Sequence, residues 1–237
     1  MSLSTKDIVD GFWRHRPEDG FPPAPVERLE EYDGAERLNL ACTQTELPPH
    51  RQQKLVEAWC EALPGFTRLR FLWMSSRVSQ ALFEAACRVP RLEGLYVKWG
   101  AIDDLSPIAR RLGLRFLHVG SAPRITSIEC LSELRGLEVL ELENLHRVAD
   151  LSVIGRLSDL EGLALYGGEK RWQVPDLAPV SRLAALRYLF LVGLRPANRS
   201  LRPLYGLEHL RTLRLDPSWP QDEVLDLQVR CPELRIT

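Results

Sequence analysis

The stretch LEGLYV at residues 92–97 sets the frame that decides the fold, because its apolar positions return along most of the 237-residue chain. Apolar residues fill the first, fourth and sixth places of each copy, and the alternation at the end of the frame is typical of a short strand. The copies start 23, 22, 23, 23, 26 and 24 residues apart. This period predicts stacked repeats, since no single unit of that length can bury its own apolar face. The other copies are LRFLWM (69–74), LRFLHV (114–119), LEVLEL (137–142), LEGLAL (160–165), LRYLFL (186–191) and LRTLRL (210–215).

A second apolar frame follows the strands and predicts a short return segment. It reads Ile102-Asp-Asp-Leu105-Ser-Pro-Ile108 in one repeat. The aspartate before its second apolar residue can cap free backbone N–H groups of a helical turn. The proline lies in the first turn, where a missing N–H costs little. The capping residues are Asp104, Ser127, Asp150 and Asp176, and the leucines expected to close the segments on the inside are Leu112, Leu134, Leu157 and Leu183.

Together the two frames resemble the leucine-rich repeat family, in particular its short bacterial, internalin-like class, over about residues 69–236. The resemblance implies an α/β fold, a right-handed solenoid or horseshoe. Each repeat would place a short parallel strand on the concave side and a short helix or helical turn on the convex side. The family usually carries Asn three residues after the last strand leucine, and this chain does not, so we expect its loop amides to find other partners and its solenoid to be less regular. That position holds Gly100, Ala122, Leu145, Gly168, Leu194 and Ser218.

The two ends of the chain differ from the repeats, as terminal caps must. Residues 1–68 are expected to form an N-terminal leader and capping region, with a possible strand at 37–40 and a helix at 50–63. The proline-containing residues 1–30 are expected to be partly extended over the first repeat. Residues 69–237 hold the repeats and a C-terminal cap with a last strand at 231–236. We expect one continuous domain.

The residues between the repeat leucines predict a partner-binding surface. In each repeat, the two residues that flank the middle leucine and the two residues that follow the strand face the concave side. Aromatic residues are concentrated at these places, and exposed aromatic residues are common binding hot spots. Alternatively, the rings strengthen the sheet by stacking on one another, or the leader or the C-terminal segment covers them. The predicted partner-binding residues are Phe71, Trp73, Tyr96, Lys98, Trp99, Phe116, His118, Glu141, Glu143, Tyr166, Tyr188, Phe190 and Arg214.

Composition argues against several other classes of function. The net charge is −1, whereas nucleic-acid-binding proteins usually carry a basic excess. The five cysteines form no CxxC pair, so we expect free thiols, no metal site and no cofactor. The sequence has neither an apolar run long enough to span a membrane nor a secretory signal. These features predict a cytoplasmic protein that binds no nucleic acid, membrane or small-molecule substrate, and the resemblance to the internalin-like class implies a bacterial one.

The sequence therefore predicts a non-catalytic module, an adaptor or scaffold, that binds another protein on its concave face. An alternative is a dedicated inhibitor or immunity-type protein for one toxin or enzyme. A third interpretation is a hydrolase centred on His118 and Glu141, which the repeat register places on adjacent strands. A carboxylate beside an imidazole can support acid–base catalysis, but no serine or cysteine nucleophile has a predicted place beside this pair.

Overall fold

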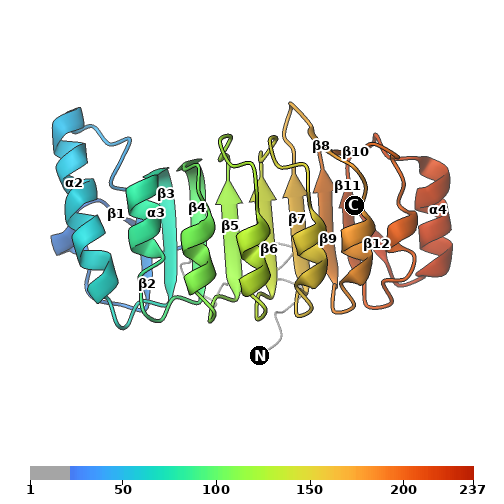
Figure 1. Ribbon diagram of the computed structural model, residues 1–237, viewed down its shortest axis with the longest axis horizontal. Helices are drawn as coiled ribbons and strands as arrows, with labels where there is room; N and C mark the ends of the chain where they lie inside the picture. The colour runs from blue at the N-terminus through green and yellow to red at the C-terminus, as the bar shows by residue number, and fades with distance from the viewer. Residues whose placement is uncertain (1–21) are drawn as a thin grey trace.

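A computed structural model describes residues 22–237, and its main feature is one open sheet of ten parallel strands (Figure 1). The strands follow chain order, but β8 and β10 are not part of this sheet, so β9 lies directly beside β7 and β11 directly beside β9. One strand per repeat in a single parallel sheet confirms the predicted α/β solenoid. The strands are β1 (Pro25–Val26), β2 (Arg37–Leu40), β3 (Phe71–Ser79), β4 (Gly94–Ala101), β5 (Phe116–Gly120), β6 (Val139–Glu143), β7 (Gly162–Tyr166), β9 (Tyr188–Val192), β11 (Thr212–Leu215) and β12 (Arg235–Ile236).

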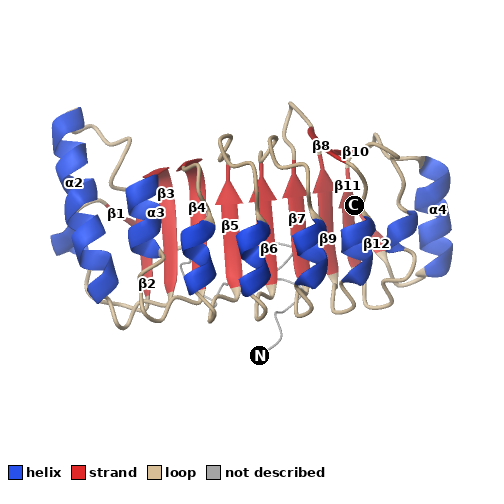
Figure 2. Cartoon of the chain, viewed as in Figure 1, coloured by secondary structure: helices blue, strands red, loops and turns tan. Residues whose placement is uncertain are grey.

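Helices and helical turns return the chain between the strands, and Figure 2 shows them along one face of the sheet. We call the opposite face, which was predicted to be concave, the helix-free face. A second, two-stranded sheet pairs β8 (Trp172–Val174) with β10 (Leu194–Pro196), and its strands lie in the loops after β7 and β9. The helical segments are η1 (Leu29–Glu31), α2 (Pro49–Ala62), η2 (Leu63–Gly65), α3 (Gln80–Ala86), η3 (Ser106–Arg110), η4 (Glu129–Glu133), η5 (Ser152–Arg156), η6 (Ala178–Arg182), η7 (Arg202–Leu204) and α4 (Gln221–Arg230).

The predicted capping residues start the helical turns. Asp104 Oδ1 accepts a hydrogen bond from the backbone N–H of Ser106 at 2.8 Å, and Asp150 Oδ1 accepts one from Ser152 at 2.8 Å. Asp176 Oδ1 repeats this contact with the N–H of Ala178, also at 2.8 Å. Each carboxylate satisfies one N–H that has no partner within the turn.

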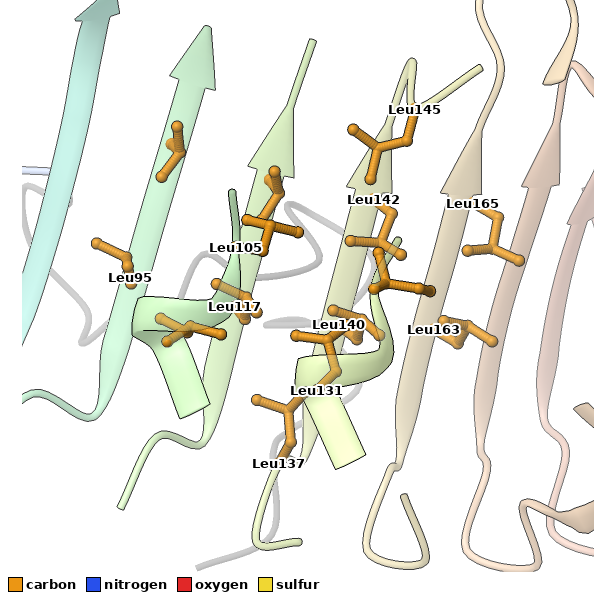
Figure 3. Packing of buried hydrophobic residues seen from close by; sticks show 14 of the residues in the cluster. Leu95, Leu105, Leu117, Leu131, Leu137, Leu140, Leu142, Leu145, Leu163 and Leu165 are labelled. Atoms are coloured by element: carbon orange, nitrogen blue, oxygen red, sulfur yellow. The ribbon is translucent and has the colours of Figure 1, made fainter. Parts of the chain in front are cut away.

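The repeat leucines fill the space between the sheet and the helical turns (Figure 3). Leu117 and Leu140 point from neighbouring strands toward Leu105 and Leu131 of the turns, and all four are buried. One hydrophobic core runs from β2 to the C-terminal cap. Each repeat therefore stabilises the next through shared apolar contacts.

The prediction for Leu112 was wrong. Its side chain is 68% exposed, whereas Leu134, Leu157 and Leu183 are buried as expected. These three residues end their helical turns, and Arg111 holds the same place in the Leu112 repeat. The Arg111 guanidinium donates a 2.6 Å hydrogen bond to the carbonyl of Val89. The segment therefore turns one residue earlier than the leucine spacing indicated.

Backbone contacts between repeats replace the missing asparagines. The N–H of Ser121 donates to the carbonyl of Glu143 at 2.8 Å, and the N–H of Asn144 donates to the carbonyl of Tyr166 at 2.7 Å. Ser121 and Asn144 both have positive φ, 46° and 58°, which turns the chain directly after the strand. The loop amides thus find partners in the next repeat, as the sequence analysis required.

The elements expected before the repeats are present. The strand at 37–40 is β2, and the helix at 50–63 is α2, which begins one residue earlier and ends one residue earlier. Residues 1–21 of the predicted leader lie outside the described part of the chain. The described part of the leader contacts the first strands, where Asn39 Nδ2 donates to the carbonyl of Pro23 at 2.9 Å. At the other end β12 is the expected last strand, preceded by the helix α4.

Candidate partner-binding surface

The strand register brings the predicted central column together. Trp73 pairs with Tyr96, Tyr96 with His118, and His118 with Glu141 on successive strands. The column continues through Ala164, Phe190 and Arg214. The spacing of the repeat leucines was therefore sufficient to place these residues side by side.

Most of the predicted aromatic residues are buried, so the expectation of a broad exposed aromatic patch was wrong. Trp73 is 3% exposed and Tyr188 is 1% exposed. They belong to a cluster separate from the leucine core, which we call the ring cluster. Its members are Phe71, Trp73, Phe116, Val139, Ala164, Tyr188 and Phe190, with Tyr96 and Tyr166 packed against it.

Contacts within the sheet account for part of this burial. The rings of Phe71 and Phe116 lie 6.2 Å apart between centroids, across the small residue Gly94. A Cβ added to Gly94 would lie 2.7 Å from the Phe71 ring, so this ring occupies the space above the glycine. Small residues in the strands are therefore covered by their neighbours' rings, which agrees with the stacking alternative for this part of the sheet.

The guanidinium groups of three arginines also cover rings, through a charged row that the sequence analysis missed. Arg115 lies over the Phe116 ring at 5.1 Å, and its Nε donates to Glu138 Oε1 at 2.8 Å. Arg70 bonds Glu93 in the same way, from Nε to Oε1 at 2.6 Å. Arg187 lies over Tyr188 at 5.2 Å and pairs with Glu161 at 3.0 Å. These residues all occupy the second place of the repeat frame, directly after its first leucine. Arginine and glutamate alternate there from residue 70 to residue 138, which was visible in the sequence.

The ion pair between Arg70 and Glu93 changes the pH range in which the Glu93 carboxyl is ionised. The hydrogen bond from Arg70 lowers the pKa of the Glu93 carboxyl, against an opposing effect of burial. Glu93 therefore stays ionised in the folded chain at pH values where a free glutamate begins to bind a proton.

Six of the predicted residues remain at least partly exposed, and we call them the exposed set. Trp99 is 42% exposed, the ammonium of Lys98 lies 4.3 Å from the centroid of its ring, and Arg214 lies 5.8 Å from the Phe190 ring. Amphipathic groups held over a rigid sheet offer contact area at a low cost in conformational entropy. The exposed set comprises Tyr96, Lys98, Trp99, Glu143, Tyr166 and Arg214.

His118 joins the ring cluster to the charged members of the exposed set. Its ring stacks on Tyr96 with a centroid distance of 4.1 Å. Its Nδ1 lies 3.0 Å from Glu141 Oε2, as the predicted pairing required, and its Nε2 lies 3.8 Å from Glu143 Oε2. The imidazole is 2% exposed, so a solute in bulk water has almost no access to it.

Tyr166 carries the electrostatic influence of the same carboxylates. Burial raises the pKa of its hydroxyl, the charge of Glu141 raises it further, and the nearby Arg214 opposes the shift. The phenol is therefore neutral at physiological pH and can donate or accept a hydrogen bond.

Residues 22–237 contain no group of three or more histidine, cysteine, aspartate or glutamate side chains placed to hold a metal ion. Among these residues, no serine, threonine or cysteine side chain hydrogen-bonds to His118 or Glu141. In the part of the chain that the structure describes, no helix has both the length and the apolar character needed to cross a membrane.

Solved structures of leucine-rich repeat proteins share this fold. No family model matches the chain, and the search of curated proteins found no match. The internalin inlF of Listeria monocytogenes superposes with a TM-score of 0.58 at 20% identity, covering 73% of this chain and 48% of the internalin. This chain therefore spans about half the length of that structure. Internalin C2 of the same species gives a TM-score of 0.54 at 18% identity and covers 75% and 74% of the two chains. A leucine-rich repeat protein of Leptospira interrogans gives 0.55 at 15% identity and covers 75% and 50%. By its repeats and its architecture, this chain has the leucine-rich repeat fold found in the internalins.

Proposed function

We propose that the chain is a non-catalytic module that binds another protein through the exposed set on its helix-free face. The observation that carries the proposal is Trp99, a tryptophan 42% exposed beside Lys98 at the end of a rigid strand. Tryptophan, tyrosine and arginine are the residues most enriched in binding hot spots. The exposed set contains all three types.

The buried ring cluster has a supporting role in this proposal. Phe116, His118 and Phe190 pack beneath or beside exposed residues and restrict their rotamers. A side chain that is already ordered loses less entropy when a partner binds. Phe71, Trp73 and Tyr188 would likewise act through the shape of the sheet rather than by direct contact.

The hydrolase alternative finds little support in the geometry. A catalytic base must come within hydrogen-bond distance of the substrate proton, and His118 lies under Tyr96 with 2% exposure. Its partner Glu141 is also buried. We interpret the His118–Glu141 contact as a polar support within the ring cluster.

The exposed set is compatible with both an adaptor and a dedicated inhibitor. An adaptor is expected to bind several proteins with modest affinity, whereas a dedicated inhibitor is expected to bind one protein very tightly. Quantitative capture from a lysate of the host organism, followed by titration of each purified partner, distinguishes them. A single partner with a nanomolar dissociation constant would favour the inhibitor.

The cysteines bear on where this binding takes place. All five are free in the structure, and burial raises the pKa of the Cys87 thiol to about 12. Free thiols persist in reducing compartments. We therefore include a bacterial cytoplasm in the proposal.

The experiment that tests the function compares capture by the wild-type chain and by the Tyr96→Ala/Trp99→Ala variant. Loss of two hot-spot side chains is expected to weaken partner binding by about 30-fold or more. The control is Val229→Ala, which removes an apolar side chain, 80% exposed, from α4. Equal binding by all three chains would contradict the proposal, provided that their melting temperatures agree.

A further inference from the structure

Strands β3 and β4 extend farther than the other repeat strands and form a groove at their carboxyl ends. They have nine and eight residues, whereas β5, β6, β7 and β9 have five each. After a register shift, Arg77 pairs with Trp99 and Ser79 with Ala101. Strand β5 pairs with β4 only from Gly94 to Val97, so the last residues of β4 have no strand partner on that side.

The space beside this extension is an open groove with a volume of about 510 Å³. This is within the size range of small-ligand sites, about 300–1,000 Å³. Trp99 and Ala101 line it on the β4 side, Ser121 and Pro123 line it on the β5 side, and Arg77 and Arg124 also contribute. It lies next to the exposed set because Trp99 belongs to both.

The groove carries an excess of positive charge. Two arginines line it and no carboxylate does, while the ammonium of Lys98 lies over Trp99. Within residues 22–237, none of these three cations lies within 4.0 Å of a carboxylate oxygen. The arginines at the amino ends of the strands differ, because Arg70, Arg115 and Arg187 are each paired with a glutamate.

Hydrogen bonds hold the walls of the groove in place. Arg124 Nη2 donates to the carbonyl of Ala101 at 2.6 Å. The backbone N–H of Arg77 donates to Gln44 Oε1 at 2.9 Å. The Arg124 guanidinium is thus held in place directly, whereas the Arg77 guanidinium is carried on anchored backbone. Both groups keep further N–H donors for a ligand.

We propose that this groove binds an acidic segment of the partner protein. Carboxylates of the segment pair with Arg77 and Arg124, and an apolar side chain beside them packs on Trp99. The proposal rests on the protein-binding function and names the chemistry of the partner. A peptide is favoured over a single-stranded nucleic acid, because single-strand sites stack successive bases on several aromatic side chains. Among the described residues that line this groove, Trp99 is the only aromatic one.

The test uses an end-blocked acidic octapeptide, Asp-Glu-Phe-Asp-Glu-Leu-Asp-Glu, and its amide counterpart, Asn-Gln-Phe-Asn-Gln-Leu-Asn-Gln. Each is titrated into the full-length chain while the indole N–H signal of Trp99 is followed by NMR. The signal is assigned from its loss in Trp99→Phe. We expect the acidic peptide to shift this signal, the amide peptide to shift it much less, and added salt to reduce the effect.

Two charge-matched double variants locate the binding. Arg77→Gln/Arg124→Gln is expected to weaken binding of the acidic peptide by about tenfold, the sum of two partly exposed ion pairs. Arg110→Gln/Arg135→Gln removes the same charge from the helical face and is expected to leave the dissociation constant within about twofold. Both arginines are exposed.

Several results would overturn the proposal. They are an unshifted Trp99 signal at about 1 mM acidic peptide, equal shifts with the amide peptide, equal weakening in both double variants, or tighter binding of an eight-residue oligothymidylate. A partner whose capture requires Trp99 but neither Arg77 nor Arg124 would also overturn it. In that case the protein-binding function would stand, so a failure of the acidic-segment proposal can be distinguished from a failure of the proposed function.

Discussion

At the scale of single residues, the helix-free face contains two kinds of aromatic side chain. Trp73 is 3% exposed inside the ring cluster, whereas Trp99 is 42% exposed at its edge. Both occupy positions that the repeat frame assigns to the same face. Their surroundings, rather than their residue type, separate a structural ring from a candidate contact.

This difference gives the first prediction. Trp73→Ala should destabilise the chain by about 3–5 kcal/mol, because it leaves a cavity in a packed cluster. Trp99→Ala should change the unfolding free energy by less than about 0.5 kcal/mol. Urea unfolding of both variants measures the two values. Similar losses from the two substitutions would mean that Trp99 is also a structural ring.

The Arg70–Glu93 contact predicts a pH dependence. Because the pKa of Glu93 is lowered in the folded chain, its contribution to stability is present above the unfolded pKa, near 4.5, and is lost as the pH falls through the lower folded pKa. Glu93→Gln should therefore destabilise the chain by about 1–2 kcal/mol at pH 7, as expected for a half-buried charged hydrogen bond. The gap to wild type should shrink from pH 4.5 downward.

Urea unfolding at several pH values measures this gap. Glu46→Gln is the control, since Glu46 is exposed. A gap for Glu93→Gln that stays constant down to pH 3 would show that the pair does not contribute through its charge.

Two cysteines give a prediction about reactivity. Burial raises the pKa of both Cys42 and Cys87 to about 12, so the reactive thiolate is scarce at pH 8. Neither thiol should react with Ellman's reagent in the folded chain, and both should react in concentrated urea. Mass-spectrometric mapping of the labelled thiols checks this. Rapid labelling without urea would contradict the packing of these two sites.

At the scale of elements, the helical turns differ in how they end. Leu134 and Leu157 close η4 and η5 inside the core, whereas Arg111 closes η3 and leaves Leu112 exposed. A comparison of two leucines therefore tests the register. Leu134→Ala should cost about 2–5 kcal/mol of unfolding free energy, and Leu112→Ala less than about 0.5 kcal/mol. Thermal melts of the two variants measure the difference, and equal losses would contradict the shift at Leu112.

The elements also indicate what the sequence could predict. The spacing of the repeat leucines was enough to place His118 beside Glu141, because a fixed repeat determines strand register. The local apolar patterns at 37–40 and 50–63 were enough to locate β2 and α2. The burial of Trp73 could not be read from the same frame, since a face assignment does not say what packs beside a ring. The one-residue shift at Leu112 depends on the geometry of a single turn. The first part of the charged row was visible in the sequence, because the signs alternate from Arg70 through Glu93 and Arg115 to Glu138.

At the scale of the whole molecule, the sheet divides the chain into a leucine core on one side and a charged, aromatic face on the other. The core is shared by all repeats, so the sheet acts as one rigid support. The exposed set and the basic groove meet at Trp99, near the carboxyl ends of β3 and β4. Binding at this edge would leave the helical side free.

Hydrogen exchange of the chain with and without its captured partner tests the central claim most directly. Protection on binding is expected in the segments that carry the exposed set, around residues 96–101, 141–144, 164–168 and 212–215. The turns η3 to η6 should exchange at the same rate in both states. Protection confined to those turns or to α4, with none around Trp99, would contradict the claim that this protein binds its partner through the helix-free face.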